Sequence, residues 1–180
     1  MSATEKITLA TAWLDGCSGC HMSFLDLDER LITLAELVDV VYSPIVDTKE
    51  LPQQVDVGIL EGAVSSEEDL AKARMFRERC KFLISLGDCA ITGNVPSMRN
   101  MFDLDEVFDR AFVETVQAQP QRPTEGLPQL LQPVRPIHHV VPVDLVVQGC
   151  PPSADTIWYV LTELMAGRAP DPTQITRFGA

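Results

Sequence analysis

Four of the five cysteines in this 180-residue chain lie within two residues of a glycine. Cys17 and Cys20 form a C-x-x-C pair in "GCSGC", Cys89 follows "LGD", and Cys150 ends "VVQGC". Thiolates bind zinc and iron–sulfur clusters, and a C-x-x-C pair at a helix N-terminus can also exchange disulfides. These cysteines therefore predict a metal centre or a redox dithiol, and the choice depends on where the fold places them.

The segments between these cysteines alternate between strand and helix patterns. Short apolar runs rich in β-branched residues predict strands at 6–14, 38–43, 55–64, 81–88 and 143–150. Amphipathic or capped segments predict helices at 22–38, 65–80 and 153–167, with a further helical piece near 103–112. Such alternation indicates an α/β fold, because parallel strands need crossover connections. We expect a single flavodoxin-like domain over residues 1–180, with a doubly wound, mainly parallel sheet.

Two segments fall outside this alternation. Residues 117–142 hold six of the 13 prolines, too many for a regular helix or a central strand. We expect this stretch to form a long proline-rich excursion that serves a function or binds a partner. Residues 168–180 follow the last predicted helix and are expected to form a C-terminal tail.

Each of the four glycine-flanked cysteines follows the carboxyl end of a predicted strand. Cys17 and Cys20 follow the first strand, Cys89 follows the fourth and Cys150 follows the fifth. Because these strand ends meet at one edge of a parallel sheet, where α/β proteins bind ligands, the four thiols are expected to converge. Cys80 lies at the start of the fourth strand, at the opposite edge, so we expect it to pack in or near the core.

Four converging thiols are compatible with more than one chemistry. Four-thiolate zinc sites usually use two close C-x-x-C pairs, whereas here the third and fourth cysteines come singly from distant loops. A [4Fe–4S] cube accepts ligands from separate elements more readily, so the spacing favours iron–sulfur over zinc. A thioredoxin-like dithiol at Cys17 and Cys20 would leave Cys89 and Cys150 unexplained. Burial without a metal is the plainest interpretation of a single cysteine, but it is disfavoured for four cysteines that all lie beside glycines at strand ends.

The three histidines do not form a ligand set of their own. His21 adjoins Cys20 and could donate a hydrogen bond to a cluster sulfur or carry protons, but we expect a surface or interface residue. His138 and His139 lie in the proline-rich stretch, and we expect them to be loop residues.

The composition excludes several classes of partner. A formal net charge of −12 opposes binding to nucleic acid or to an anionic membrane surface, since both attract basic patches. No apolar run approaches the roughly 18–20 residues that a membrane span needs, and we see neither a signal peptide nor a twin-arginine pair. We expect a cytoplasmic location, where thiols stay reduced and closely spaced cysteines bind metal or perform redox chemistry.

Three motifs resemble the small subunit of [NiFe] hydrogenases and the related cluster-bearing subunit of respiratory complex I. They are "WLDGCSGCHMS" from Trp13, "GDCAITG" from Gly87 and "GCPP" from Gly149; "EGAV" at 61–64 is similar to the family's third-strand loop. The complex I subunit has adjacent cysteines in the first motif, so the C-x-x-C spacing indicates the hydrogenase type. Membrane-bound and periplasmic relatives carry a signal peptide and a domain with two further clusters, which we expect this chain to lack. It thus resembles the short small subunit of cytoplasmic, bidirectional, NAD-reducing hydrogenases.

The resemblance implies a proximal [4Fe–4S] cluster held by Cys17, Cys20, Cys89 and Cys150. It implies a nickel–iron centre in a separate large subunit docked against the cluster edge, and diaphorase or iron–sulfur subunits that link the electrons to NAD. The chain itself would carry electrons and hold no hydrogen-activating site. The loop after the first strand lacks a Ser/Thr/Gly-rich phosphate cradle, so the sequence does not predict an FMN site in this chain alone. Binding of a flavin shared with the large subunit remains an open alternative. A complex I-like relay without nickel and a zinc-stapled structural module stay open as well.

Overall fold

The computed structural model describes residues 6–176, and its centre is a five-stranded sheet. The strands are β1 (Ile7–Trp13), β2 (Val38–Tyr42), β3 (Val55–Glu61), β5 (Cys80–Leu86) and β7 (Leu145–Val147). They lie in the order β2-β1-β3-β5-β7, and every neighbouring pair is parallel. This is the doubly wound order in which the chain first adds a strand on one side of β1 and then adds the rest on the other side. The predicted flavodoxin-like α/β fold is confirmed.

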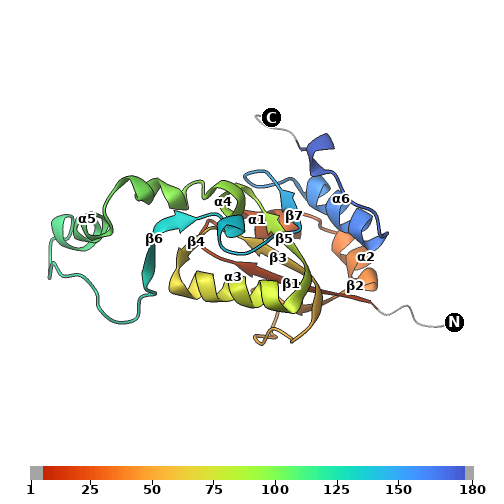
Figure 1. The fold of residues 1–180 in the computed structure, drawn as a ribbon, viewed down its shortest axis with the longest axis horizontal. Coiled ribbons are helices and arrows are strands. Elements are labelled where there is room, and N and C mark those ends of the chain that lie inside the picture. The colour runs from red at the N-terminus through yellow and green to blue at the C-terminus, as the bar shows by residue number, and fades with distance from the viewer. Residues whose placement is uncertain (1–5, 177–180) are drawn as a thin grey trace.

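Helices cover both faces of the sheet (Figure 1). They are α1 (Gly19–Leu25), α2 (Arg30–Leu37), α3 (Glu67–Arg79), α4 (Asp88–Thr92) and α6 (Ala154–Met165). A further helix, α5 (Leu104–Asp109), lies away from the sheet (Figure 1). Side chains alternate along each strand, so Leu83 faces the core cluster that contains Phe76 of α3, while Ile84 faces the cluster built on α1, α2 and α6. Full burial of a side chain such as Phe76 stabilises the fold by roughly 1.5–3 kcal/mol. Within residues 6–176, no helix is long and apolar enough to cross a membrane.

The helix expected over 22–38 is divided in two. Helix α1 begins earlier, at Gly19, and ends at Leu25, and α2 begins at Arg30. Between them Asp28 has a left-handed φ of 51°, a conformation that aspartate tolerates better than most residues. The turn places Leu27, which is 1% exposed, in the core. The prediction of one unbroken helix was therefore wrong. The apolar spacing is nearly the same on both sides of the turn, so the sequence pattern did not indicate the break.

The strand expected over 55–64 also ends early. β3 stops at Glu61, and a short strand β4 (Val64–Ser66) leaves the sheet and pairs antiparallel with β6 (Leu130–Arg135). Gly62 makes the break with a φ of +83°, and a Cβ there would lie 2.7 Å from the carbonyl carbon of Leu14. A glycine is needed at this turn because both the backbone angle and the space exclude a side chain.

The stretch 117–142 contains β6 and the 3₁₀ turn η3 (Ile137–His139), although we predicted no strand there. β6 accommodates Pro133 because its two-stranded pairing with β4 is irregular, so a residue without an N–H breaks no regular ladder. Before it, the 3₁₀ turn η1 (Pro96–Met101), α5 and the π-helical turn η2 (Arg110–Glu114) form an arm that extends away from the sheet (Figure 1). In the expected tail, Pro172–Gln174 form the 3₁₀ turn η4, and residues 177–180 lie outside the described part.

Candidate metal centre

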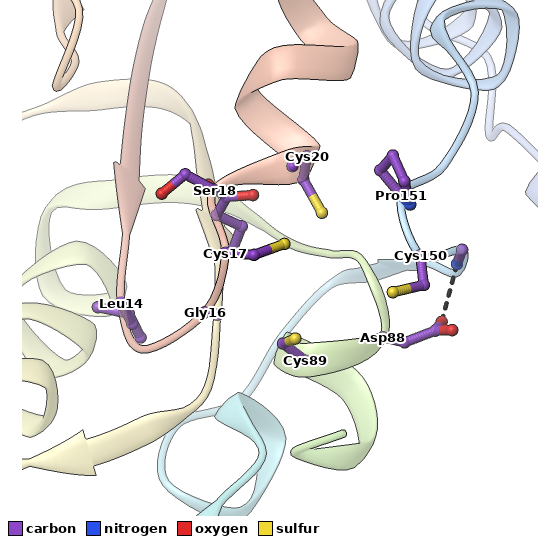
Figure 2. A pocket seen from close by; sticks show the side chains of 13 residues that line it. Leu14, Gly16, Cys17, Ser18, Cys20, Asp88, Cys89, Cys150 and Pro151 are labelled. Atoms are coloured by element: carbon purple, nitrogen blue, oxygen red, sulfur yellow. Dashed lines mark hydrogen bonds between the residues drawn. The ribbon is translucent and has the colours of Figure 1, made fainter. Parts of the chain in front are cut away.

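The four cysteines singled out in the sequence line one hollow at the carboxyl edge of the sheet. Cys17 lies in the loop after β1 and Cys20 in the first turn of α1; Cys89 lies in the first turn of α4, after β5, and Cys150 in the loop after β7. Figure 2 shows their side chains around a common space. The hollow encloses about 330 Å³, part of it open to solvent. Residues separated by more than a hundred positions meet there because all the strands are parallel.

Three hydrogen bonds fix the loops that carry Cys89 and Cys150 against each other. The N–H of Gly87 donates to the carbonyl of Val147 (2.7 Å), and the N–H of Asp88 donates to the carbonyl of Gly149 (2.9 Å). In return the N–H of Gly149 donates to the carboxylate of Asp88 (2.8 Å), the contact drawn as a dashed line in Figure 2. These three bonds extend the β5–β7 pairing past the strand ends and set the spacing of the two thiols.

Gly87 keeps the middle of the site open. It has a φ of +83°, and a Cβ built on it would collide with the sulfur of Cys20. The loop between β5 and α4 therefore passes directly beside the Cys20 thiol, and only a residue without a side chain fits there.

The thiols differ in exposure and in acidity. Cys17 and Cys150 are exposed, whereas Cys20 and Cys89 are partly buried. Burial raises the pKa of the Cys20 thiol well above its usual range, and the carboxylate of Glu61 raises it further. Burial also raises the pKa of the Cys89 thiol, with the neighbouring Cys150 and Cys17 acting in the same direction. Metal ligation needs thiolates, so a cationic group in the hollow would displace these protons.

The donor set suits an iron–sulfur cluster. It consists of four soft sulfur ligands that surround a hollow, and the side-chain amide of Asn94 donates to the sulfur of Cys150 (3.4 Å). Among residues 6–176, no three His, Cys, Asp or Glu side chains are placed to hold a single metal ion. Four thiols around one hollow could each bind a different iron of an iron–sulfur cluster.

The sequence prediction for His21 was wrong. Its side chain is not on the surface; the residue is 4% exposed and both ring nitrogens have partners. Nδ1 lies 2.7 Å from the carboxylate of Glu61, and Nε2 lies 2.9 Å from the hydroxyl of Thr11. Glu61, which is 3% exposed, lines the hollow and is a site residue that the sequence motifs did not single out. An acid at the end of a buried strand, within the "EGAV" segment, was the available signal.

The remaining candidates lie as expected. Cys80 is 3% exposed and packs in the core cluster next to α3, so its assignment to the core is confirmed. His138 and His139 are exposed in the short turn η3, where their rings contact each other edge to face with centroids 4.6 Å apart. Neither histidine lines the hollow.

Comparison with known proteins gives one consistent result. Residues 17–164 match the family described as the NADH ubiquinone oxidoreductase 20 Kd subunit. The chain is 42% identical over 179 residues to the delta subunit of the NAD-reducing hydrogenase HoxS of Cupriavidus necator, covering 96% of this chain and 86% of that one. It is 40% identical over 169 residues to a subunit of the F420-non-reducing hydrogenase of Methanothermobacter marburgensis, covering 91% of this chain and 54% of that one.

Solved structures agree with the sequence relatives. A crystal structure of an NAD⁺-reducing [NiFe]-hydrogenase in the H₂-reduced state superposes with a TM-score of 0.91 and 39% identity, over 97% of this chain and 99% of that one. A [NiFeSe] hydrogenase of Desulfomicrobium baculatum, at 14% identity and a TM-score of 0.58, shares the fold, and 93% of this chain covers 67% of its chain. The chain therefore belongs to the family of the NADH ubiquinone oxidoreductase 20 Kd subunit, and within it to the hydrogenase small subunits of the NAD-reducing type.

Proposed function

We propose that this chain is the electron-transfer small subunit of a cytoplasmic [NiFe] hydrogenase and that Cys17, Cys20, Cys89 and Cys150 hold one [4Fe–4S] cluster. Electrons would pass between the nickel–iron site of a large subunit and an NAD-linked diaphorase module. The observation that carries the proposal is the meeting of four thiols, from three separate strand ends, around one hollow. The hydrogenase relatives at 42% and 39% identity support the same function.

The chain's own residues would hold the cluster and adjust its surroundings. When bound, the cluster supplies one-electron transfer at a potential set by sulfur hydrogen bonds, charge and solvent exposure. The amide of Asn94 would donate to the ligand sulfur of Cys150 and so favour the more negative, reduced state. Gly87 would leave room for the ligand at Cys20. The relay role needs no general acid, base or nucleophile from this chain.

Exposed apolar side chains support a partner over the cluster edge. Met22 in α1, two residues after Cys20, is 60% exposed, and Val95 and Met98, which follow α4, are 64% and 59% exposed. Exposed apolar side chains near a functional edge are typical of subunit interfaces. Because Cys17 and Cys150 are also exposed, a docked large subunit would both cover the cluster and approach it closely.

Metal analysis of the assembled complex tests the proposal. The complex is purified anaerobically from its native host through a tag on this chain, and nickel, iron and zinc are quantified. We expect nickel in a one-to-one ratio to the chain, together with several irons. Iron without nickel would replace the hydrogenase assignment by a complex I-like relay. Stoichiometric zinc without iron would contradict electron transfer altogether and indicate a structural zinc site.

A further inference from the structure

Four buried polar side chains form a continuous path from the cysteine hollow into the protein. Glu61, His21, Thr11 and Ser43 are 3%, 4%, 4% and 2% exposed. The His21 ring joins Glu61 to Thr11 through the contacts of 2.7 Å and 2.9 Å, and the Thr11 hydroxyl donates to the hydroxyl of Ser43 (2.8 Å). Burying so many polar groups is costly unless each is hydrogen-bonded, so this path holds its members in defined positions.

The path passes through the first turn of α1, the helix that carries Cys20, because His21 belongs to that turn. Ser18 precedes this helix with a left-handed φ of 60°, and its side chain makes no capping hydrogen bond. The N–H groups of the first turn that have no partner within the helix therefore need another acceptor. The backbone N–H of His21 donates to Oε2 of Glu61 (3.2 Å), so a carboxylate from the end of β3 provides that acceptor.

His21 thus contacts both oxygens of the Glu61 carboxylate. Its ring nitrogen Nδ1 contacts Oε1, and its backbone N–H donates to Oε2. The carboxylate cannot rotate without breaking one of these bonds. Trp13 supports the ring from the side with an edge-to-face contact, at a centroid distance of 5.4 Å. Since Cys20 immediately precedes His21, these two contacts with Glu61 fix α1 to β3 next to the Cys20 thiol.

We propose that His21 is a positioning residue for the ligand thiol of Cys20, acting through the carboxylate of Glu61. The inference rests on the proposed cluster. His21 supplies the donors that hold the carboxylate and offset its negative field, and Glu61 lies in the wall of the hollow. Without the ring of His21, the carboxylate would face the cluster with one hydrogen-bond donor fewer and would be less firmly held, which would disfavour the added electron and lower the midpoint potential.

Three substitutions separate this role from simple packing. His21→Leu removes both ring contacts. His21→Asn places an amide donor near the position of Nδ1 and keeps the contact with Glu61, whereas His21→Gln places one near Nε2 and keeps only the contact with Thr11. Each is measured in the anaerobically purified complex by EPR with redox titration, and by thermal unfolding. The reference signal is the one present in the wild type and absent from Cys89→Ala.

We expect His21→Leu to alter the EPR line shape of that signal. We also expect its midpoint to fall by at least the 59 mV that corresponds to a tenfold change in the reduction equilibrium of a one-electron couple. His21→Asn should restore both properties and His21→Gln should not. A folded His21→Leu complex with the wild-type signal and midpoint would overturn the inference. Should His21→Leu fail to fold, equal behaviour of the Asn and Gln variants would overturn it instead. If even the wild type lacks the reference signal, the proposed cluster fails first.

Discussion

At the scale of single residues, the site depends on the absence of a side chain at Gly87. Its φ of +83° is a left-handed conformation, and the space where a Cβ would lie is taken by the sulfur of Cys20. Two costs therefore coincide at one position: backbone strain, which any L-residue would suffer, and a collision that displaces a single thiol. Gly167, beyond the end of α6, has a similar φ of +71° but nothing within 4 Å of its Cβ position.

Gly87→Ala and Gly167→Ala separate these costs. Both variants should lose about 1–2 kcal/mol of stability, because alanine is strained in the left-handed region. Gly87→Ala alone should also displace Cys20 and lose most of the iron of this centre, as measured by iron content and EPR of the complex. Equal iron content in the two variants would show that the thiol of Cys20 does not need its present position.

At the scale of elements, the start of helix α3 is fixed by a capping pattern that is visible in the sequence and present in the structure. Ser66 caps the helix: its hydroxyl accepts from the N–H of Asp69 (3.1 Å), while the carboxylate of Asp69 accepts from the N–H of Ser66 (3.0 Å). This reciprocal capping box satisfies donors that the first helical turn leaves free. The helix packs Phe76 and Ala73 against the sheet, so its start determines how that face of the core is covered.

Ser66→Ala should lower the free energy of unfolding by about 1 kcal/mol, because the first turn of α3 loses its acceptor. Urea unfolding of the anaerobically purified chain measures the change. Ser66→Thr is the matched variant, since it keeps a hydroxyl acceptor and should lose less. Equal losses for the two variants would assign the effect to packing at this nearly buried position and contradict a capping role.

Helices and strands could be predicted from the sequence where the pattern that specifies them lies within one segment. The strands and α3 were predictable because apolar runs and a capping pattern are local features of the sequence. The meeting of the four cysteines was predictable because the carboxyl ends of parallel strands lie at one edge of the sheet. The turn at Asp28 and the strand around Pro133 were not predictable, since each depends on packing that local patterns do not encode. His21 was misplaced for the same reason: its partner Glu61 is 40 positions away in the sequence.

At the scale of the whole molecule, the cysteine edge is where burial is incomplete. Both faces of the sheet are covered by helices, yet two of the four site thiols are exposed and the adjoining segments present Met22, Val95 and Met98 to solvent. An electron relay needs this asymmetry, because its cofactor must be close to a surface that another subunit covers. The opposite edge holds Cys80 inside the core, where burial raises the pKa of its thiol to about 11.

The central claim is that the four edge cysteines, and not the fifth, hold one [4Fe–4S] cluster. The most direct test compares the wild-type complex with Cys89→Ala and Cys80→Ala, each purified anaerobically through a tag on this chain, by iron analysis and EPR of the reduced protein. We predict that Cys89→Ala loses one cluster signal and up to about four irons per complex, while Cys80→Ala keeps both. Unchanged iron and EPR in Cys89→Ala, or an equal loss in Cys80→Ala, would contradict the claim.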